Sequence, residues 1–132
     1  MDTDREALLK RIGDKRGFRF GLHDFLAETD PQHMERFNEW VEYLYLSQKH
    51  LDRKTKELII IGVCCAIKDD PRHIGVHIKA AIQNGATKEE IRETIYLQSL
   101  WAGALGMVSG LEAWRRAFAP QAPPVVEPVD IG

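Results

Sequence analysis

The fold of this chain follows from residues 70–90, which have the sequence DPRHIGVHIKAAIQNGATKEE. Asp70 is the predicted N-cap of a helix. The proline after it is the predicted first helical residue, because the missing N–H of proline costs nothing there. Gly85 predicts the end of this helix, since glycine accepts the left-handed backbone that closes helices. Thr87 and Glu90 have the spacing of a capping box and predict the start of a second helix.

Two histidines stand out on the first of these helices. Its apolar residues recur at helical spacing and form one stripe, made of Ile74, Ile78, Ala81 and Ile82. His73 and His77 lie on the neighbouring stripe, one turn apart, at the edge of the buried face. Two interpretations stay open: ordinary histidines at the margin of a core, or histidines in the wall of a pocket.

Composition limits the class of protein. The 132 residues have a formal net charge of −2, which excludes the broad basic surface of a nucleic-acid-binding domain. The longest apolar run, Leu58 to Ile67, is too short to span a bilayer and predicts a buried helix. The charged N-terminus is not followed by the apolar core of a signal peptide, so we expect a cytoplasmic protein without membrane contact.

The remaining patterns predict an all-α fold. Apolar residues recur at helical spacing along most of the chain, and no strand-like alternation appears. We expect a single helical domain over residues 1–119 and a Pro-rich extended arm over residues 120–132. The helix that contains Leu58 to Ile67 is apolar on every side, and a chain of this size cannot easily cover it alone. Neighbouring copies of the chain are therefore expected to supply cover.

Three segments carry a family resemblance. The segments Leu51–Ile59 and Asn84–Ile91, together with the Ala102-Gly103 pair, resemble the carboxymuconolactone decarboxylase family, whose other branch is the alkyl hydroperoxidase D-like proteins. The similarity covers roughly Phe37 to Phe118. It implies an alkyl hydroperoxidase D-like bundle of about six helices that assembles as a homotrimer or homohexamer.

The hydroperoxidase branch uses a Cys-x-x-Cys-x-x-x-His motif with an upstream Glu. Aligned on His77, this motif places Asp70 and His73 where the two cysteines belong. Cys64 and Cys65 lie instead within the apolar run, where burial makes a thiol inert. We therefore expect them to be core residues. A thiol-dependent peroxide reductase that uses Cys64 or Cys65 is the alternative.

The decarboxylase branch implies proton transfer on a small carboxylated lactone without a cofactor. In this interpretation His73 or His77 protonates the carbon left by carbon dioxide, because imidazole exchanges protons near neutral pH. Glu57 matches the upstream Glu of the family, and the three side chains are expected to line a small pocket. Arg53 is the expected ligand of a substrate carboxylate. Asp70, on the same face as the histidines, is first a cap and second a residue that contacts substrate.

Two further interpretations remain. His73 and His77 have the spacing of paired zinc ligands, and Asp70 or Glu57 could add an oxygen. The pattern lacks the Glu next to the first His that marks a zinc-protease helix, so we assign no metal. The other interpretation is a non-catalytic oligomeric binding protein that kept the fold and lost the reaction.

Overall fold

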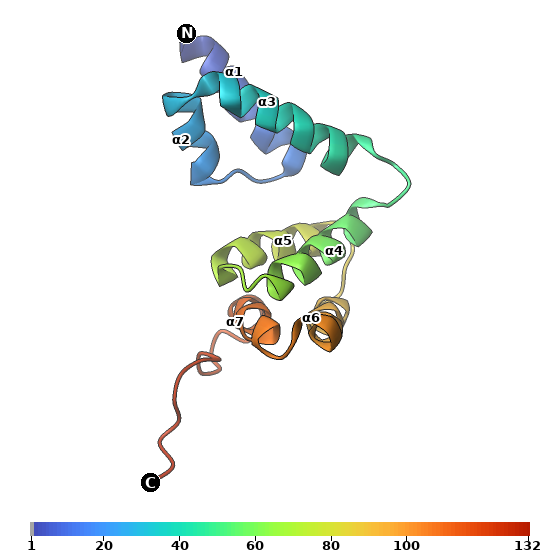
Figure 1. The fold of residues 1–132 in the computed structure, drawn as a ribbon, viewed down its shortest axis with the longest axis vertical. Coiled ribbons are helices and arrows are strands. Elements are labelled where there is room, and N and C mark those ends of the chain that lie inside the picture. Colours follow the sequence, from blue (N-terminus) through green and yellow to red (C-terminus); the bar gives the residue numbers. More distant parts are fainter. Residues whose placement is uncertain (1) are drawn as a thin grey trace. The chain divides into compact units, whose positions relative to one another are not determined.

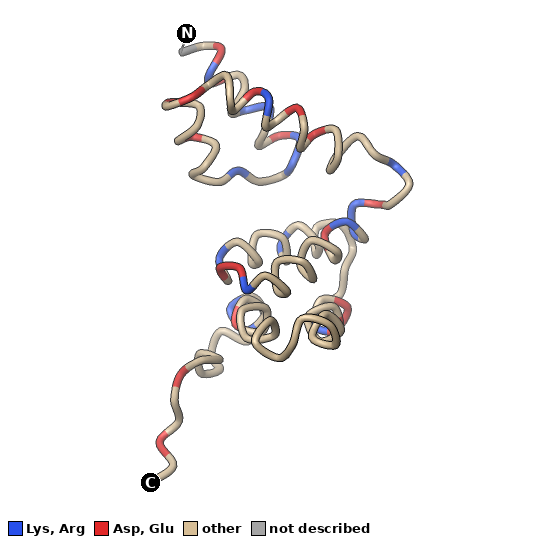
Figure 2. Tube along the Cα trace, viewed as in Figure 1, with Lys and Arg blue, Asp and Glu red and all other residues tan. Residues whose placement is uncertain are grey.

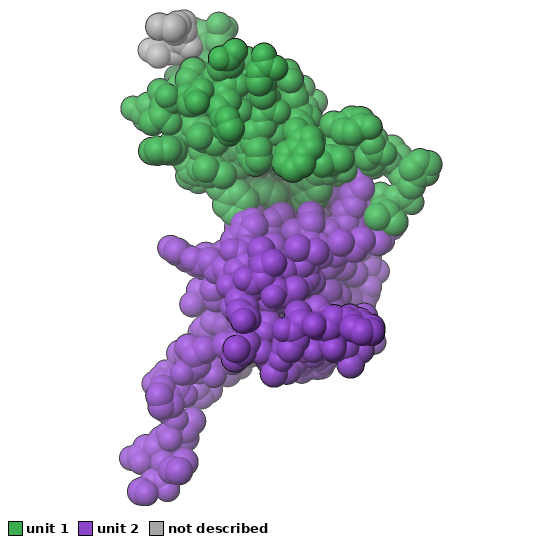
Figure 3. Space-filling model, viewed as in Figure 1, with its two compact units in different colours: residues 1–51 green, residues 52–132 purple. Residues whose placement is uncertain are grey.

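The computed structural model describes residues 2–132 and divides the chain into two compact units, Met1–Leu51 and Asp52–Gly132 (Figure 3). Each unit is described by itself. Over residues 2–132 the regular structure consists of α-helices and one π-helical segment, without strands, so the predicted all-α class is confirmed. The described residues form seven α-helices where about six were expected. The single domain over residues 1–119 stays a prediction.

The first unit is a small helical cluster. Its helices are α1 (Asp2–Arg16), α2 (Gly21–Thr29) and α3 (Pro31–Val41), and α3 continues into the π-helical segment η1 (Glu42–Ser47) (Figure 1). Its apolar core is made of Leu9, Ile12, Ala27 and Met34. Beside this core lies a buried polar group, in which Arg16 donates to His23 and Asn38, and Asn38 donates to Glu42.

The second unit packs four helices around one core (Figure 1). They are α4 (Arg53–Ala66), α5 (Pro71–Gln83), α6 (Lys88–Ala102) and α7 (Leu105–Phe118). The core contains both cysteines together with residues from every helix: Ile61, Cys64, Cys65, Ile74, Ile78, Ala81, Ala86, Ile91, Ile95 and Ala113. In Figure 2 the charges of α4 gather at its beginning, because no charged residue follows Glu57 within the helix.

The ends of these helices are the predicted ones. The Asp70 carboxylate accepts a hydrogen bond from the Arg72 backbone N–H, and the proline occupies the first turn of α5. Gly85 has a φ of +94°, the left-handed conformation expected after the end of α5. The Thr87 side chain accepts from the Glu90 N–H, and Glu90 accepts from the Thr87 N–H, which completes the capping box of α6.

Two glycines of α7 allow a close approach to other helices. A Cβ on Gly106 would lie 2.8 Å from the Cys65 carbonyl oxygen, and a Cβ on Gly110 would lie 2.5 Å from the Cys65 Sγ. Both glycines therefore allow tight backbone packing. It fixes α7 against the C-terminal half of α4.

The arm after Phe118 begins with fixed contacts. Arg115 donates to the carbonyls of Pro120 and Ala122, and the Val125 N–H donates to Glu112. Hydrogen bonds from Arg115, from the Val125 N–H and from Arg116 lower the pKa of Glu112 to about 2, against the effect of burial. The residues beyond Val125 carry no helix or strand. Among residues 2–132, no helix is long and apolar enough to cross a membrane.

Candidate active site

Glu57 is the buried centre of the candidate site. Its side chain, on the second turn of α4, has no exposed surface. Oε1 accepts a hydrogen bond from Arg53 Nε at 2.8 Å, and Oε2 lies 2.8 Å from Nδ1 of His77. The carboxylate is thus held between a guanidinium one turn earlier on α4 and an imidazole on α5. Burial lowers the pKa of Arg53.

His77 and His73 face each other along α5. Their Nε2 atoms are 3.3 Å apart, and the rings meet nearly at right angles, with centroids 4.9 Å apart. Only 7% of the His77 side chain is exposed, against 38% of the His73 side chain. The pair therefore leads from the buried carboxylate of Glu57 to the surface.

Asp69 completes the series of contacts. Its carboxylate is hydrogen-bonded to Nδ1 of His73. The short connection between α4 and α5 positions it, because Lys68 adopts a φ of +58° and the Asp69 N–H donates to the Cys64 carbonyl at 2.9 Å. Burial alone would raise the pKa of Asp69, but hydrogen bonds from His73 and from the Asp70 backbone outweigh it and lower the pKa.

The hydrogen bonds constrain where protons lie. Each Nδ1 faces a carboxylate, which accepts an N–H and cannot donate one when ionised. The N–H of each ring is therefore on Nδ1, and the two Nε2 atoms point at each other. They form a hydrogen bond when one of them also carries a proton. The series Glu57, His77, His73 and Asp69 is thus suited to holding and moving a proton.

The predicted site residues are found in two places. Glu57, His73 and His77 lie together as expected, and Arg53 joins them through Glu57. Asp70 does not join them: its carboxylate accepts from Arg72 Nη2 at 2.7 Å on the surface. Asp69 occupies the position next to His73 instead. The sequence signal for Asp69 is its i, i+4 spacing from His73. The cap-and-proline pattern instead pointed to Asp70.

The cysteines are core residues, as predicted. Cys65 is fully buried and Cys64 is 6% exposed. Burial, together with the nearby Asp69 carboxylate, raises the pKa of Cys64 to about 12 and that of Cys65 to about 11. Cys64 Sγ nevertheless lies 3.9 Å from Nδ1 of His73. A sulfur atom therefore borders the outer end of the histidine pair.

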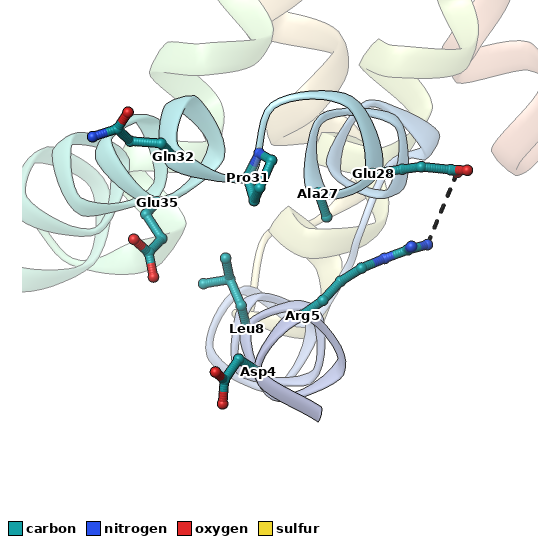
Figure 4. A pocket seen from close by; sticks show the side chains of 8 residues that line it. All are labelled: Asp4, Arg5, Leu8, Ala27, Glu28, Pro31, Gln32 and Glu35. Carbon is teal, nitrogen blue, oxygen red and sulfur yellow. Dashed lines mark ion pairs between the residues drawn. The ribbon is translucent and has the colours of Figure 1, made fainter. Parts of the chain in front are cut away.

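Among the described residues, at least two hollows also occur away from this site. One, of about 630 Å³, lies between α5 and α7 and is floored by Ile78 and Ala113. The other, of about 530 Å³, lies in the first unit beside Leu8 and Ala27, where Arg5 and Glu28 form an ion pair (Figure 4). The two histidines and Glu57 line neither hollow, so the pocket expected around them stays a prediction.

Comparison with known proteins places the chain in a family. The model of the carboxymuconolactone decarboxylase family matches residues 31–116. Nitrosuccinic acid decarboxylase npaB of Metarhizium robertsii is 29% identical over 77 residues, which are 58% of this chain and 53% of that protein. The chain thus spans about half the length of this curated relative. No solved structure matches. The match extends from α3 into α7 and therefore includes the site on α4 and α5. The chain belongs to the carboxymuconolactone decarboxylase family.

Proposed function

We propose that the chain is a cofactor-independent decarboxylase of a small carboxylated substrate, in which the histidine pair delivers a proton. The observation that carries this proposal is the continuous series of contacts from buried Glu57 through His77 to His73. The family and the name of the relative, which acts on nitrosuccinic acid, support the reaction type. A carboxylated lactone is the substrate class that the family name suggests.

The site residues have separate roles in the proposed reaction. When the C–C bond to the carboxylate breaks, carbon dioxide leaves and the electron pair stays on carbon. A proton from Nε2 of His77 or His73 then bonds to that carbon, and solvent returns a proton to the pair. Glu57 holds Nδ1–H of His77 and stabilises the ring while it is positively charged. His73, which is the more exposed of the two, contacts the substrate.

Arg53 is the proposed group that attracts the substrate carboxylate. Its guanidinium has five N–H donors in a planar fork, and the Nε–H is directed at Glu57. Arg53 and His77 contact the two oxygens of the same carboxylate, so the proposed substrate carboxylate would bind beside the histidine pair. Asp70 lies apart from the histidine pair and is hydrogen-bonded to Arg72. It supports substrate binding only indirectly, because it caps the start of α5, the helix that carries both histidines.

The test compares two histidine substitutions. His77→Gln keeps the side-chain volume roughly constant but removes the titratable ring, and we expect kcat for carbon dioxide release from carboxymuconolactone or nitrosuccinic acid to fall by about 10²- to 10⁴-fold. His33→Gln, on the surface of the first unit, is the matched control and should leave kcat unchanged. Turnover that survives His77→Gln would overturn the proposed mechanism. A chain with no turnover on either acid would favour the non-catalytic binding protein.

Assembly is part of the same proposal. We propose a homotrimer or homohexamer, because α4 and α6 expose large apolar side chains. Ile59 and Val63 on α4 and Ile67 directly after it are 50% to 69% exposed. Leu97, Leu100 and Trp101 are 62% to 94% exposed on α6. Exposed apolar residues clustered in this way mark a surface that other protein covers.

A further inference from the structure

We propose that Cys64, Asp69 and His73 form a binding site for one Zn²⁺ ion. One ligand atom from each residue, the thiol sulfur, a carboxylate oxygen and a ring nitrogen, lies within 4.8 Å of the other two. The residues come from the end of α4, from the turn after it and from the first turn of α5. This set differs from the zinc pair considered from the sequence, since His77 is not among the ligands.

The distance between the sulfur and the ring nitrogen suits a tetrahedral ion. Asp69 and Nδ1 of His73 are in direct hydrogen-bond contact, and a zinc ion would replace the proton of this contact and move the two ligand atoms apart. Zinc binds sulfur at about 2.3 Å and nitrogen or oxygen at about 2.0–2.2 Å, so its ligand atoms lie roughly 3–4 Å from one another. The Cys64 Sγ and His73 Nδ1 atoms are 3.9 Å apart, at the upper end of that range. The turn holds the third ligand in place through the hydrogen bond from the Asp69 N–H to the Cys64 carbonyl.

The chemistry of the donor set favours zinc over harder cations. Thiolate and imidazole are ligands of borderline-soft metals, whereas Mg²⁺ and Ca²⁺ prefer oxygen donors alone. The thiol of Cys64 is buried next to a carboxylate, an arrangement that disfavours a second negative charge. A bound divalent cation reverses this preference, because a coordinating thiol loses its proton. Binding therefore releases one proton from Cys64 to the buffer.

The contacts behind His73 are those of a metal-bound imidazole. With zinc on Nδ1, the ring carries its hydrogen on Nε2, which lies 3.3 Å from Nε2 of His77. His77 in turn donates its Nδ1–H to Glu57. Metal-ligating histidines almost always donate their second N–H, most often to a carboxylate, a backbone carbonyl or water. Here His77 accepts it, and the Glu57 carboxylate lies behind His77. The side chains of Asp69 and His73 are 27% and 38% exposed, so the ion can enter from solvent and a water can complete its coordination.

The proposal goes beyond the proposed decarboxylation and is tested without substrate. The full chain, freed of metal with a chelator, is titrated with Co²⁺ and then with Zn²⁺. We expect one Co²⁺ per chain, a near-ultraviolet charge-transfer band from thiolate to cobalt, and loss of this band when Zn²⁺ displaces the cobalt. Calorimetry in buffers of different ionisation enthalpy should show release of about one proton.

Substitutions then identify the ligands. Cys64→Ala should abolish the band, whereas Cys65→Ala, which removes the neighbouring buried thiol, should keep it. Asp69→Asn changes a partly exposed residue and should weaken binding more than about 100-fold. His77→Gln should weaken it by about 10- to 100-fold, as expected for a partner of a ligand. No stoichiometric binding to the folded wild-type chain, or a band that survives Cys64→Ala, would overturn the proposal.

Discussion

Cys64 and Cys65 show how the surroundings of a residue decide its chemistry. Both thiols are buried, and both have a raised pKa, about 12 for Cys64 and about 11 for Cys65. A thiol must lose its proton before it attacks a peroxide or a disulfide. A peroxide reductase needs the opposite shift, so the environment of these two residues disfavours that alternative.

This difference predicts slow thiol labelling. In the metal-free native chain at pH 7, a disulfide reagent should react with Cys64 and Cys65 about 100-fold more slowly than with an unperturbed thiol, whose pKa is about 8.5. The labelling rate should rise with pH as the thiolate fraction grows. Unfolding in urea is the control, since it should release two rapidly reacting thiols per chain. Rapid labelling of one thiol in the native chain would contradict this prediction and would support the thiol-dependent peroxide reductase.

At the scale of elements, the contact between α4 and α7 depends on the absence of side chains. Gly110 lies against Cys65 and Ile95, where a Cβ would come within 2.5 Å of sulfur and 2.8 Å of a methyl carbon. Gly75, in the middle of α5, has no heavy atom within 4 Å of the same position. Two helical glycines in one unit therefore have opposite environments.

We expect the two alanine substitutions to change stability in opposite directions. Gly110→Ala should lower the free energy of unfolding by about 1–3 kcal/mol, because the core must shift to admit the methyl group. Gly75→Ala should raise it by about 0.5–1 kcal/mol, because alanine loses less backbone entropy in a helix than glycine does. Urea unfolding of the two variants measures both changes. A Gly110→Ala variant as stable as the wild type would show that α7 does not pack closely on α4.

At the scale of the whole molecule, the apolar surface of α6 predicts assembly. Burying one leucine stabilises an interface by about 1.5–3 kcal/mol, and Leu97 and Leu100 are both largely exposed on this helix. The double substitution Leu97→Glu and Leu100→Glu keeps good helix formers in α6 but introduces charge. We expect its mass by light scattering to fall to that of a single chain.

The control for this prediction changes a polar position. Gln83→Glu alters an exposed residue at the end of α5 and should leave the mass of the wild-type oligomer unchanged. A wild-type chain that is monomeric at micromolar concentration would contradict the proposed assembly.

Local signals were sufficient for the helices and for part of the site. Asp70, Gly85 and Thr87 act on backbone groups within four residues of themselves, so their effect does not depend on the rest of the fold. The helical period likewise placed His73 and His77 on one face before any contact was known. The all-α class, these helix ends and the histidine pair could therefore be predicted from the order of the residues.

The family resemblance had already grouped Glu57 with the histidines, but packing between helices decided which atoms of the site meet. Glu57 meets His77 only because α4 lies against α5, and no spacing within one helix predicts a pair 20 residues apart. The turn between those helices directs Asp69, rather than Asp70, towards His73, because Lys68 takes a left-handed conformation there. It also brings Cys64 beside the same ring. Contacts of this kind depend on side chains from separate elements meeting in space, and only the folded chain contains that information.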